Sequence, residues 1–267
     1  MKLSKENFFV SFVDESMKDY FFEKPIIYNV ELLLFCLPEI INGPWIKVVR
    51  EVKNVFKKYP VQRHIHGPFM DLAYHSRDQE VCDLARRKIE LGLAIAGDIG
   101  AGHIVFHSTY NPLVADPSYI KVWSQRTAQF WSELIPIAER NKCIIVIENV
   151  YDNAPKLLKK LVQQVNSPYF KVCFDVGHAH IFGNVPLEKW ITTFKNDLIH
   201  IHLHDNSKIY DEHGGLGTGT IDFKKFFASI DKLRLSPAFV LEVKNDKELE
   251  KSIQYLKKNR YWKENKL

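Results

Sequence analysis

The chain has 267 residues, of which 46% are hydrophobic, and it carries a formal net charge of +5 at pH 7. This length and apolar content are enough to bury a large core in one α/β barrel or in two smaller domains. Because the Lys and Arg residues are scattered, the mild positive charge points to no anionic partner, and no apolar run approaches the roughly 18 residues of a membrane span.

Short β-rich segments recur along the chain, and a helical pattern follows each of them, as expected of βα units. The predicted strands are residues 8–13, 30–35, 62–66, 103–107, 143–148, 171–175, 198–204 and 239–243. A doubly wound sheet usually has only about five or six strands. Eight alternations therefore predict a (β/α)8 TIM barrel, which we expect to form a single domain over residues 1–267.

Several predicted helices carry start and stop signals. A long helix from about Arg77 to Asp98 ends in the glycine-rich stretch GDIGAG. Asp116 is the expected N-cap of a later helix, with Pro117 in its first turn. Pro155 and Pro186 open two further helices. We find no linker and no internal repeat, which favours one domain.

Polar side chains close most of the predicted strands or stand in the loops just after them. In a barrel of this kind the chemistry lies at the C-terminal ends of the strands and in those loops. The residues at these positions are His66, His107, Glu148, Asp175, His178, His202, Asp211, His213 and Glu242. Any one of these residues on its own is best explained as a solvated loop residue or a hydrogen-bonded anchor. Nine of them at the same end of the barrel predict a common site.

The chemistry of these nine side chains indicates metal binding. Imidazole nitrogen and carboxylate oxygen are ligands that borderline divalent metals prefer, Zn²⁺ first among them, with Mn²⁺ or Mg²⁺ as other choices. Carboxylates gathered so closely would raise one another's pKa values unless cations lay among them. We therefore expect divalent ions at the mouth of the barrel.

The motifs HGPF, VFHS, VIEN, FDVGHAH, HIHLHDN, DEHGGLGTG and LEV, in this order, resemble those of the xylose isomerase-like barrel superfamily, which includes AP endonuclease family 2. The resemblance covers most of the chain. In the isomerase and epimerase members it implies one ion held by Glu148, Asp175, His202 and Glu242. In the endonuclease IV branch it implies three zinc ions and five further ligands, which correspond here to His66, His107, His178, Asp211 and His213.

Charge favours the larger ligand set. One divalent ion with the three carboxylates of Glu148, Asp175 and Glu242 leaves a net charge of −1, which suits an uncharged polyol. Three divalent ions with a bridging hydroxide leave a positive site that attracts a phosphodiester. Because the five extra ligands have no evident use with one metal, we expect a metal-dependent phosphoesterase that binds up to three Zn²⁺ ions. Its substrate would be a small or nucleotide-like metabolite, with metal-bound hydroxide as nucleophile and Glu148 as a bridging ligand.

Two alternatives stay open. The first is a single-metal sugar or sugar-phosphate isomerase or epimerase, in which Glu148 and Glu242 both bind the metal and shuttle protons on either face of the substrate carbon. The second is a barrel without catalysis that binds a ligand or partner at a vestigial site. An AP endonuclease acting on DNA is not favoured, because FCLPEIINGPW and HSTYNPLVADPSY lack the basic residues that phosphate contacts need.

The stretch LIHIHLHDN alternates histidines with apolar residues, so the imidazoles of one strand point into the barrel. His202 then lies level with the other ligands, and His200 lies one pleat deeper. We expect His200, like His64 and His103, to pack in the lumen and to orient ligands through the outer nitrogen.

Residues beyond the ligand layer are candidates for contact with the substrate. His204 ends the seventh predicted strand, Asp205 follows it, and His180 lies beyond the sixth strand. Phe69 in HGPF is also included, although packing against a neighbouring loop is the favoured role for it. Four further aromatic residues suggest pocket walls for a small organic group: Trp45, Tyr110, Tyr119 and Trp123.

The four cysteines, Cys36, Cys82, Cys143 and Cys173, are widely spaced and form no disulfide-like framework. The first residues have no long apolar core and no cleavage site. We therefore expect reduced thiols and a cytoplasmic location. The expected partner is a small molecule, and the sequence leaves the oligomeric state open.

Overall fold

The computed structural model describes residues 3–13, 21–22, 26–114 and 116–262. Within them, eight parallel strands pair in chain order, and the last pairs with the first, so that the sheet closes into a barrel. The strands are β1 (Phe8–Phe12), β2 (Asn29–Leu32), β3 (Arg63–His66), β4 (His103–His107), β5 (Ile144–Glu148), β6 (Phe170–Asp175), β7 (Leu198–Leu203) and β8 (Ala238–Val243). The predicted TIM barrel is confirmed.

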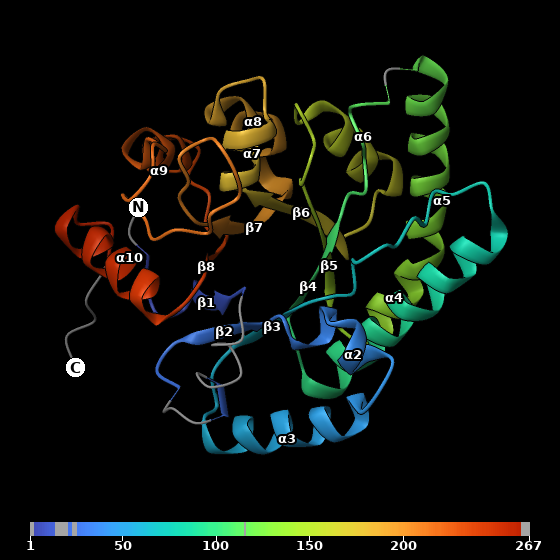
Figure 1. Ribbon diagram of the computed structural model, residues 1–267, viewed down its shortest axis with the longest axis horizontal. Coiled ribbons are helices and arrows are strands. Elements are labelled where there is room, and N and C mark those ends of the chain that lie inside the picture. Colours follow the sequence, from blue (N-terminus) through green and yellow to red (C-terminus); the bar gives the residue numbers. More distant parts are fainter. Residues whose placement is uncertain (1–2, 14–20, 23–25, 115, 263–267) are drawn as a thin grey trace.

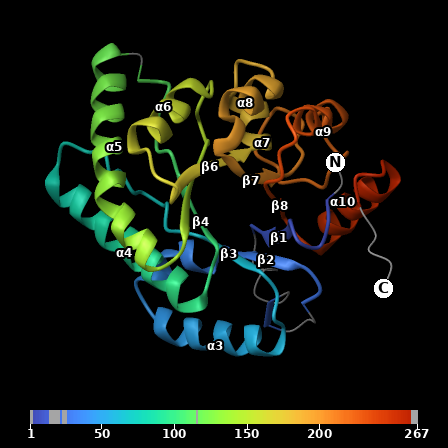
Figure 2. The same cartoon turned by 180° about the vertical axis from the view of Figure 1, so that it is seen from behind.

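Helices surround the barrel, as Figures 1 and 2 show from opposite sides. They are α2 (Pro38–Ile41), α3 (Trp45–Lys58), α4 (Gln79–Ile99), α5 (Pro117–Arg140), α6 (Lys156–Val165), α7 (Val176–Phe182), α8 (Leu187–Phe194), α9 (Phe223–Lys232) and α10 (Asp246–Lys258), with the 3₁₀ turns η1 (Leu34–Cys36) and η2 (Lys195–Asp197). Each crossover helix returns the chain to the start of the next parallel strand, so every strand ends at the same mouth.

Two apolar regions result from the alternation of side chains along the strands. The main core lies between the sheet and the helices and includes Ile104, Ile145 and Phe174. A smaller cluster made of Val105, Val146 and Cys173 is separate from it. Because these residues alternate with the members of the main core, they face the barrel lumen, and the polar residues two positions further on face the same way.

The predicted helix signals act as expected. The Asp116 carboxylate accepts a hydrogen bond from the backbone of Ser118, and Pro117 is the first residue of α5. Gly100 ends α4 in the left-handed conformation, with φ of 70°. A residue without Cβ adopts this conformation at little cost.

Three local features differ from the predictions. The strand expected over residues 30–35 ends at Leu32, because η1 takes the chain over the barrel mouth. FDVGHAH contains a short helix, α7, where only a strand end and loop were expected. The register between β6 and β7 also shifts near Val172, and the extra residue, Ile199, packs with the lumenal cluster rather than with the outer core.

The four cysteines are buried, and none of them is bonded to another. Among the described residues, every helix is too short or too polar to cross a membrane.

Candidate functional site

Four of the nine predicted ligands converge at the C-terminal ends of β5 to β8. One donor atom from each of Glu148, Asp175, His202 and Glu242 lies within 4.8 Å of the others. The sheet register explains part of this, since Asp175 pairs directly with His202 across neighbouring strands. The exposed fraction of each of these residues is 4% or less. We call these four residues the quartet.

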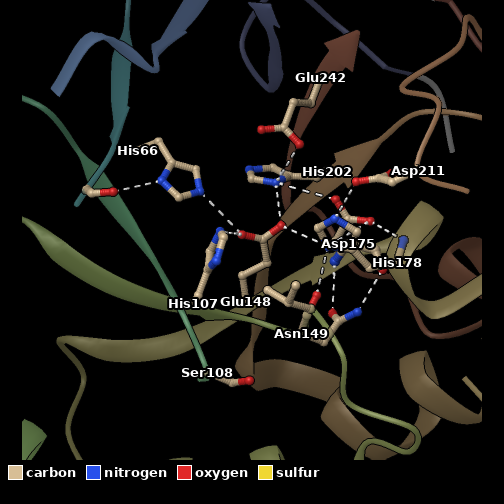
Figure 3. Close-up of polar contacts among 12 residues, drawn as sticks. His66, His107, Ser108, Glu148, Asn149, Asp175, His178, His202, Asp211 and Glu242 are labelled. Carbon is tan, nitrogen blue, oxygen red and sulfur yellow. Dashed lines mark hydrogen bonds and ion pairs between the residues drawn. The ribbon is translucent and has the colours of Figure 1, made fainter. Parts of the chain in front are cut away.

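His202 lies at the centre of the quartet (Figure 3). Its Nδ1 is 3.1 Å from Glu148 Oε1, 3.3 Å from Glu242 Oε2 and 3.7 Å from Asp175 Oδ2. Glu148 and Glu242 approach it from opposite sides in this view. Three carboxylates therefore point at one imidazole nitrogen in a space almost closed to solvent.

The electrostatics of the quartet fit a divalent cation. Burial on its own would raise the pKa of Glu148, but the charge of His202 and hydrogen bonds from His178, His202 and His66 hold this pKa well below its usual value. Without a metal, protons on the imidazoles thus balance the buried acids. A divalent ion can replace those protons, and one imidazole with three carboxylates is a suitable donor set for it.

A second group of donors lies on the β3 and β4 side of Glu148. Glu148 Oε2 is 3.4 Å from His66 Nε2 and 3.3 Å from His107 Nε2, and these three residues satisfy the spacing of a metal site. His107 pairs with Glu148 in the sheet register. Burial and neighbouring imidazoles outweigh the charge of Glu148 and lower the pKa of His107 to about 3, so this imidazole is neutral at physiological pH.

A third group lies on the opposite side and consists of His178, His204, Asp211 and His213. Asp211 Oδ2 is 3.1 Å from His178 Nε2 and 3.0 Å from His213 Nε2. Although burial opposes it, the hydrogen bond to Asp211 and the charge of Glu242 raise the pKa of His213 to about 9. All nine predicted ligands therefore lie in three adjoining groups that share Glu148 or contact one another.

The junction between β6 and α7 positions two of these donors. Asp175 ends the strand and is the N-cap of the helix, where its Oδ1 accepts a hydrogen bond of 2.6 Å from the backbone of His178. Gly177 lies so close to His204 that a Cβ on it would be 1.9 Å from the imidazole. Glycine is therefore required for the helix to pass beside this ring.

The four residues expected to touch substrate have different environments. Phe69 lines the cavity described below and stacks on His107, with ring centroids 4.0 Å apart. His204 is fully buried, contacts Asp175 at 3.1 Å and stacks on His213, so it belongs with the donors. Asp205 accepts backbone hydrogen bonds from Gly217 and Ile221 and serves to hold its loop. His180 contacts Thr220 at 2.9 Å and is not among the residues that line the cavity.

The sequence reasoning did not identify Glu31, a fully buried carboxylate on β2. It lies 3.0 Å from His200 and 2.9 Å from His202. A usable signal was present, because an acidic residue within the apolar run VELLLF is unusual in a strand covered on both faces.

The expected lumenal position of His64, His103 and His200 agrees with the structure. His103 Nδ1 is 3.0 Å from His200 Nδ1, and the rings of His64 and His103 stack with centroids 4.1 Å apart. Their connection to the quartet passes through His200 and Glu31.

A cavity of about 580 Å³ opens above the three groups of donors. Its polar lining includes donors from all three groups, and its other lining residues are Phe12, Val13, Leu33, Leu34, Cys36, Leu37, Glu39, Phe69, Val150 and Tyr151. Trp45, Tyr110, Tyr119 and Trp123, which the sequence suggested as pocket walls, are not among them. Trp123 instead is fully buried in the outer core.

Comparisons with known proteins show that this chain is similar to several of them. It is 28% identical to an uncharacterized protein of Methanocaldococcus jannaschii, over 79% of this chain and 73% of the relative. It is 25% identical to SgbU of Escherichia coli (strain K12), provisionally named an L-ribulose-5-phosphate 3-epimerase, over 73% of this chain and 72% of the relative. A solved D-tagatose 3-epimerase-like protein has a TM-score of 0.81 and 26% identity, covering 94% of this chain and 96% of that chain.

These relatives correct the expected reaction. Both named activities are sugar epimerisations, so the prediction of a phosphoesterase acting on a phosphodiester was wrong. The prediction rested on the number of donors, because five ligands beyond the quartet seemed to have no use with one metal. In the structure these side chains also contact other donors of the site and line the cavity.

The family described as Xylose isomerase-like TIM barrel matches residues 30–259, which include all nine donors. The closed eight-stranded barrel and the quartet at its mouth agree with this match. The chain belongs to the xylose isomerase-like TIM barrel family.

Proposed function

We propose that this protein is a metal-dependent epimerase of a ketose sugar and that the quartet holds its divalent ion. The observation that carries the proposal is the convergence of Glu148, Asp175, His202 and Glu242 within 4.8 Å, with two glutamates on opposite sides. The epimerase names of two similar proteins support it. A bound divalent ion would polarise the carbonyl and hydroxyl oxygens of the sugar and so acidify the neighbouring C–H bond.

The two glutamates supply what inversion of a carbon next to a carbonyl requires. One carboxylate removes the proton from C3 of a 2-ketose, and the electron pair of that C–H bond forms a C2–C3 enediolate. The other, in its protonated form, returns a proton to C3 from the opposite face, which inverts the carbon. Glu148 and Glu242 both line the cavity, and each has a second carboxylate oxygen besides the one nearest His202.

The charges around the cavity favour a sugar without phosphate. Neither Lys nor Arg is among the described residues that line it, whereas Glu39, Glu148, Asp211 and Glu242 are. A phosphate group would lie beside these acids without a Lys or Arg to pair with, and the imidazole of His213, whose pKa is raised, is already paired with Asp211. One divalent ion in the quartet leaves a net formal charge of −1, which disfavours phosphates and DNA but accepts a neutral polyol.

We propose one catalytic ion per chain and a different use for the two flanking groups. His66 and His107 on one side, and His178, Asp211 and His213 on the other, line the cavity around the quartet. Imidazole and carboxylate groups in these positions can donate to and accept from sugar hydroxyls. Metal analysis of protein loaded with Mn²⁺ and freed of excess ion tests this assignment. We expect one ion per chain, and three ions per chain would contradict it.

The proposed reaction can be tested by hydrogen exchange. Protein loaded with Mn²⁺ is incubated in D₂O with a panel of ketopentoses and ketohexoses, free and phosphorylated, and the products are analysed by NMR. We expect a 3-epimer carrying deuterium at C3, with a higher kcat/KM for the free sugars than for their phosphates.

Glu148→Gln and Glu242→Gln separate the two proton-transfer roles. Each variant should epimerise about 10²- to 10⁴-fold more slowly, while still exchanging the C3 hydrogen of one of the two epimers. Titration with Mn²⁺ checks that each variant still binds the ion. If metal-loaded wild-type protein gives no deuterium at C3 with any sugar of the panel, the proposal fails.

A further inference from the structure

Glu31 occupies a place that the proposed chemistry does not use. Its neighbours on β2, Val30 and Leu32, pack in the outer core, so the alternation of the strand turns Glu31 into the lumen. The side chain is completely buried beneath the quartet. A buried carboxylate is costly unless charged or hydrogen-bonding partners surround it. Its partners therefore indicate what it does.

Two imidazoles are those partners. Glu31 Oε1 lies 2.9 Å from His202 Nε2, and Glu31 Oε2 lies 3.0 Å from His200 Nε2. Both distances are short, but neither pair has the angle of a linear hydrogen bond. One carboxylate thus bridges a member of the quartet and the histidine one pleat below it.

The two nitrogens of His202 face different groups. Nδ1 faces the three carboxylates of the quartet at 3.1 to 3.7 Å, whereas Nε2 faces Glu31. An imidazole that binds a metal must offer an unprotonated nitrogen, and the proton then resides on the other one. For His202 to offer Nδ1 to an ion, its proton must be on Nε2, on the Glu31 side.

The layer below holds Glu31 in place. His200 contacts His103 through their Nδ1 atoms at 3.0 Å, and the backbone N–H of His103 donates to His64 Nδ1 at 2.9 Å. The His64 ring is packed between His103 and Phe9, with centroid distances of 4.1 Å to each. A packed column therefore supports the carboxylate from below and restricts its movement.

The same histidines do not form a convincing second metal site. Donor atoms of His64, His103 and His200 lie within 4.8 Å of one another. However, the rings of His64 and His103 are parallel to within 1°. The lone pairs of an imidazole lie in the plane of its ring, so those of two stacked parallel rings cannot converge on one ion. The column is better explained as support for Glu31.

We propose that Glu31 is a positioning residue for the metal site. It fixes the ring of His202 and keeps the Nε2 proton in place, which leaves Nδ1 free to bind the ion of the quartet. This inference rests on the proposed metal-dependent function. Partners of this kind typically change metal affinity by about 10- to 100-fold when they are removed.

Glu31→Gln tests the proposal with little change of shape. The amide offers one acceptor and one NH₂ donor, so it cannot accept protons from both histidines as a carboxylate does. The matched control is Asp152→Asn, which removes another fully buried carboxylate that contacts Ser108 and Val150 rather than the quartet. Calorimetric titration with Mn²⁺ should show a 10- to 100-fold higher Kd for Glu31→Gln and a Kd close to the wild-type value for Asp152→Asn.

A spectroscopic measurement on the wild-type protein does not depend on folding of the variant. In ¹⁵N-labelled protein loaded with Zn²⁺, imidazole ¹H–¹⁵N spectra should show His202 protonated at Nε2, with the assignment made by loss of the signal in His202→Gln. A His202 protonated at Nδ1, or equal Mn²⁺ affinity of Glu31→Gln and wild type, would overturn the role of Glu31. Wild-type protein that binds neither metal would instead overturn the proposed function, and this role with it.

Discussion

Ser108 and Asp152 form a buried pair beside the site. Ser108 Oγ donates to Asp152 Oδ2 at 2.5 Å, and the backbone N–H of Val150 donates to the same oxygen. Burial raises the pKa of Asp152 to about 6, although the hydrogen bonds from Ser108 and Val150 oppose this. The pair links the loop after β4 to the loop after β5.

The raised pKa of Asp152 predicts a pH effect on stability. An unfolded Asp has a pKa of about 3.9, so between about pH 4 and 6 the folded protein holds this proton more tightly. The stabilisation from the bound proton is therefore fully present below about pH 4. It is lost as the pH rises through the folded pKa and Asp152 ionises.

Asp152→Asn should remove this dependence. Between pH 4.5 and pH 7.5 the wild type should lose about 2 kcal/mol of stability as Asp152 ionises, whereas Asn has no proton to lose.

 The quantity to measure is the free energy of unfolding of the variant minus that of the wild type, from urea titrations of metal-free protein. This difference should increase by about 2 kcal/mol between the two pH values, because only the wild type loses stability as Asp152 ionises. A difference that does not change with pH would contradict the prediction.

At the scale of elements, the junction of β6 and α7 contains a residue that both stabilises a helix and belongs to the candidate metal site. Asp175 ends the strand, caps the helix and belongs to the quartet. The helix then brings His178 to Asp211 one turn later. Because no residues separate the strand from the helix, a single side chain sets the position of two groups of donors.

Two substitutions of Asp175 separate capping from metal binding. Asn caps helices about as well as Asp, whereas Ala costs about 1 kcal/mol at an N-cap. In urea titrations with chelator present, we expect Asp175→Ala to unfold about 1 kcal/mol more easily than Asp175→Asn. Both variants should bind Mn²⁺ more weakly than the wild type in calorimetry, since both lack the carboxylate. Equal stability of the two variants would argue against the capping role.

At the scale of the whole molecule, the quartet connects four consecutive strands. Its members come from β5, β6, β7 and β8, and the quartet spans residues 148 to 242 of the chain. These side chains meet only in the closed barrel, so an ion bound by all four favours the folded state over the unfolded chain.

Metal should therefore stabilise the protein as a whole. With free Mn²⁺ at 100 times its Kd, we expect the free energy of unfolding to rise by about 2.7 kcal/mol and to return to its metal-free value on addition of chelator. Thermal or urea unfolding with and without the ion measures this change. Asp175→Asn is the control and should respond less at the same Mn²⁺ concentration. A wild-type protein whose unfolding is unaffected by Mn²⁺ would contradict a metal site in the quartet.

Local patterns in the sequence were sufficient to predict the fold and to place the nine donors at one end of the barrel. Alternation of apolar residues, helix caps such as Asp116 and the glycine at position 100 identify the elements, and eight βα units imply a closed barrel. Since parallel strands in a barrel end at one mouth, residues at strand ends far apart in the chain could be placed in one site before any coordinates were known.

Only the tertiary structure decided which of these side chains touch. The contact of Glu31 with His202, the packing of Gly177 against His204 and the distance of Trp123 from the cavity depend on how the strands are staggered and how the loops pack. A sequence lists donors, but their number alone did not identify the reaction, because imidazoles and carboxylates serve equally as metal ligands, as hydrogen-bonding partners and as mutual counterions. Distance and burial distinguish these roles, and both arise only when the barrel closes.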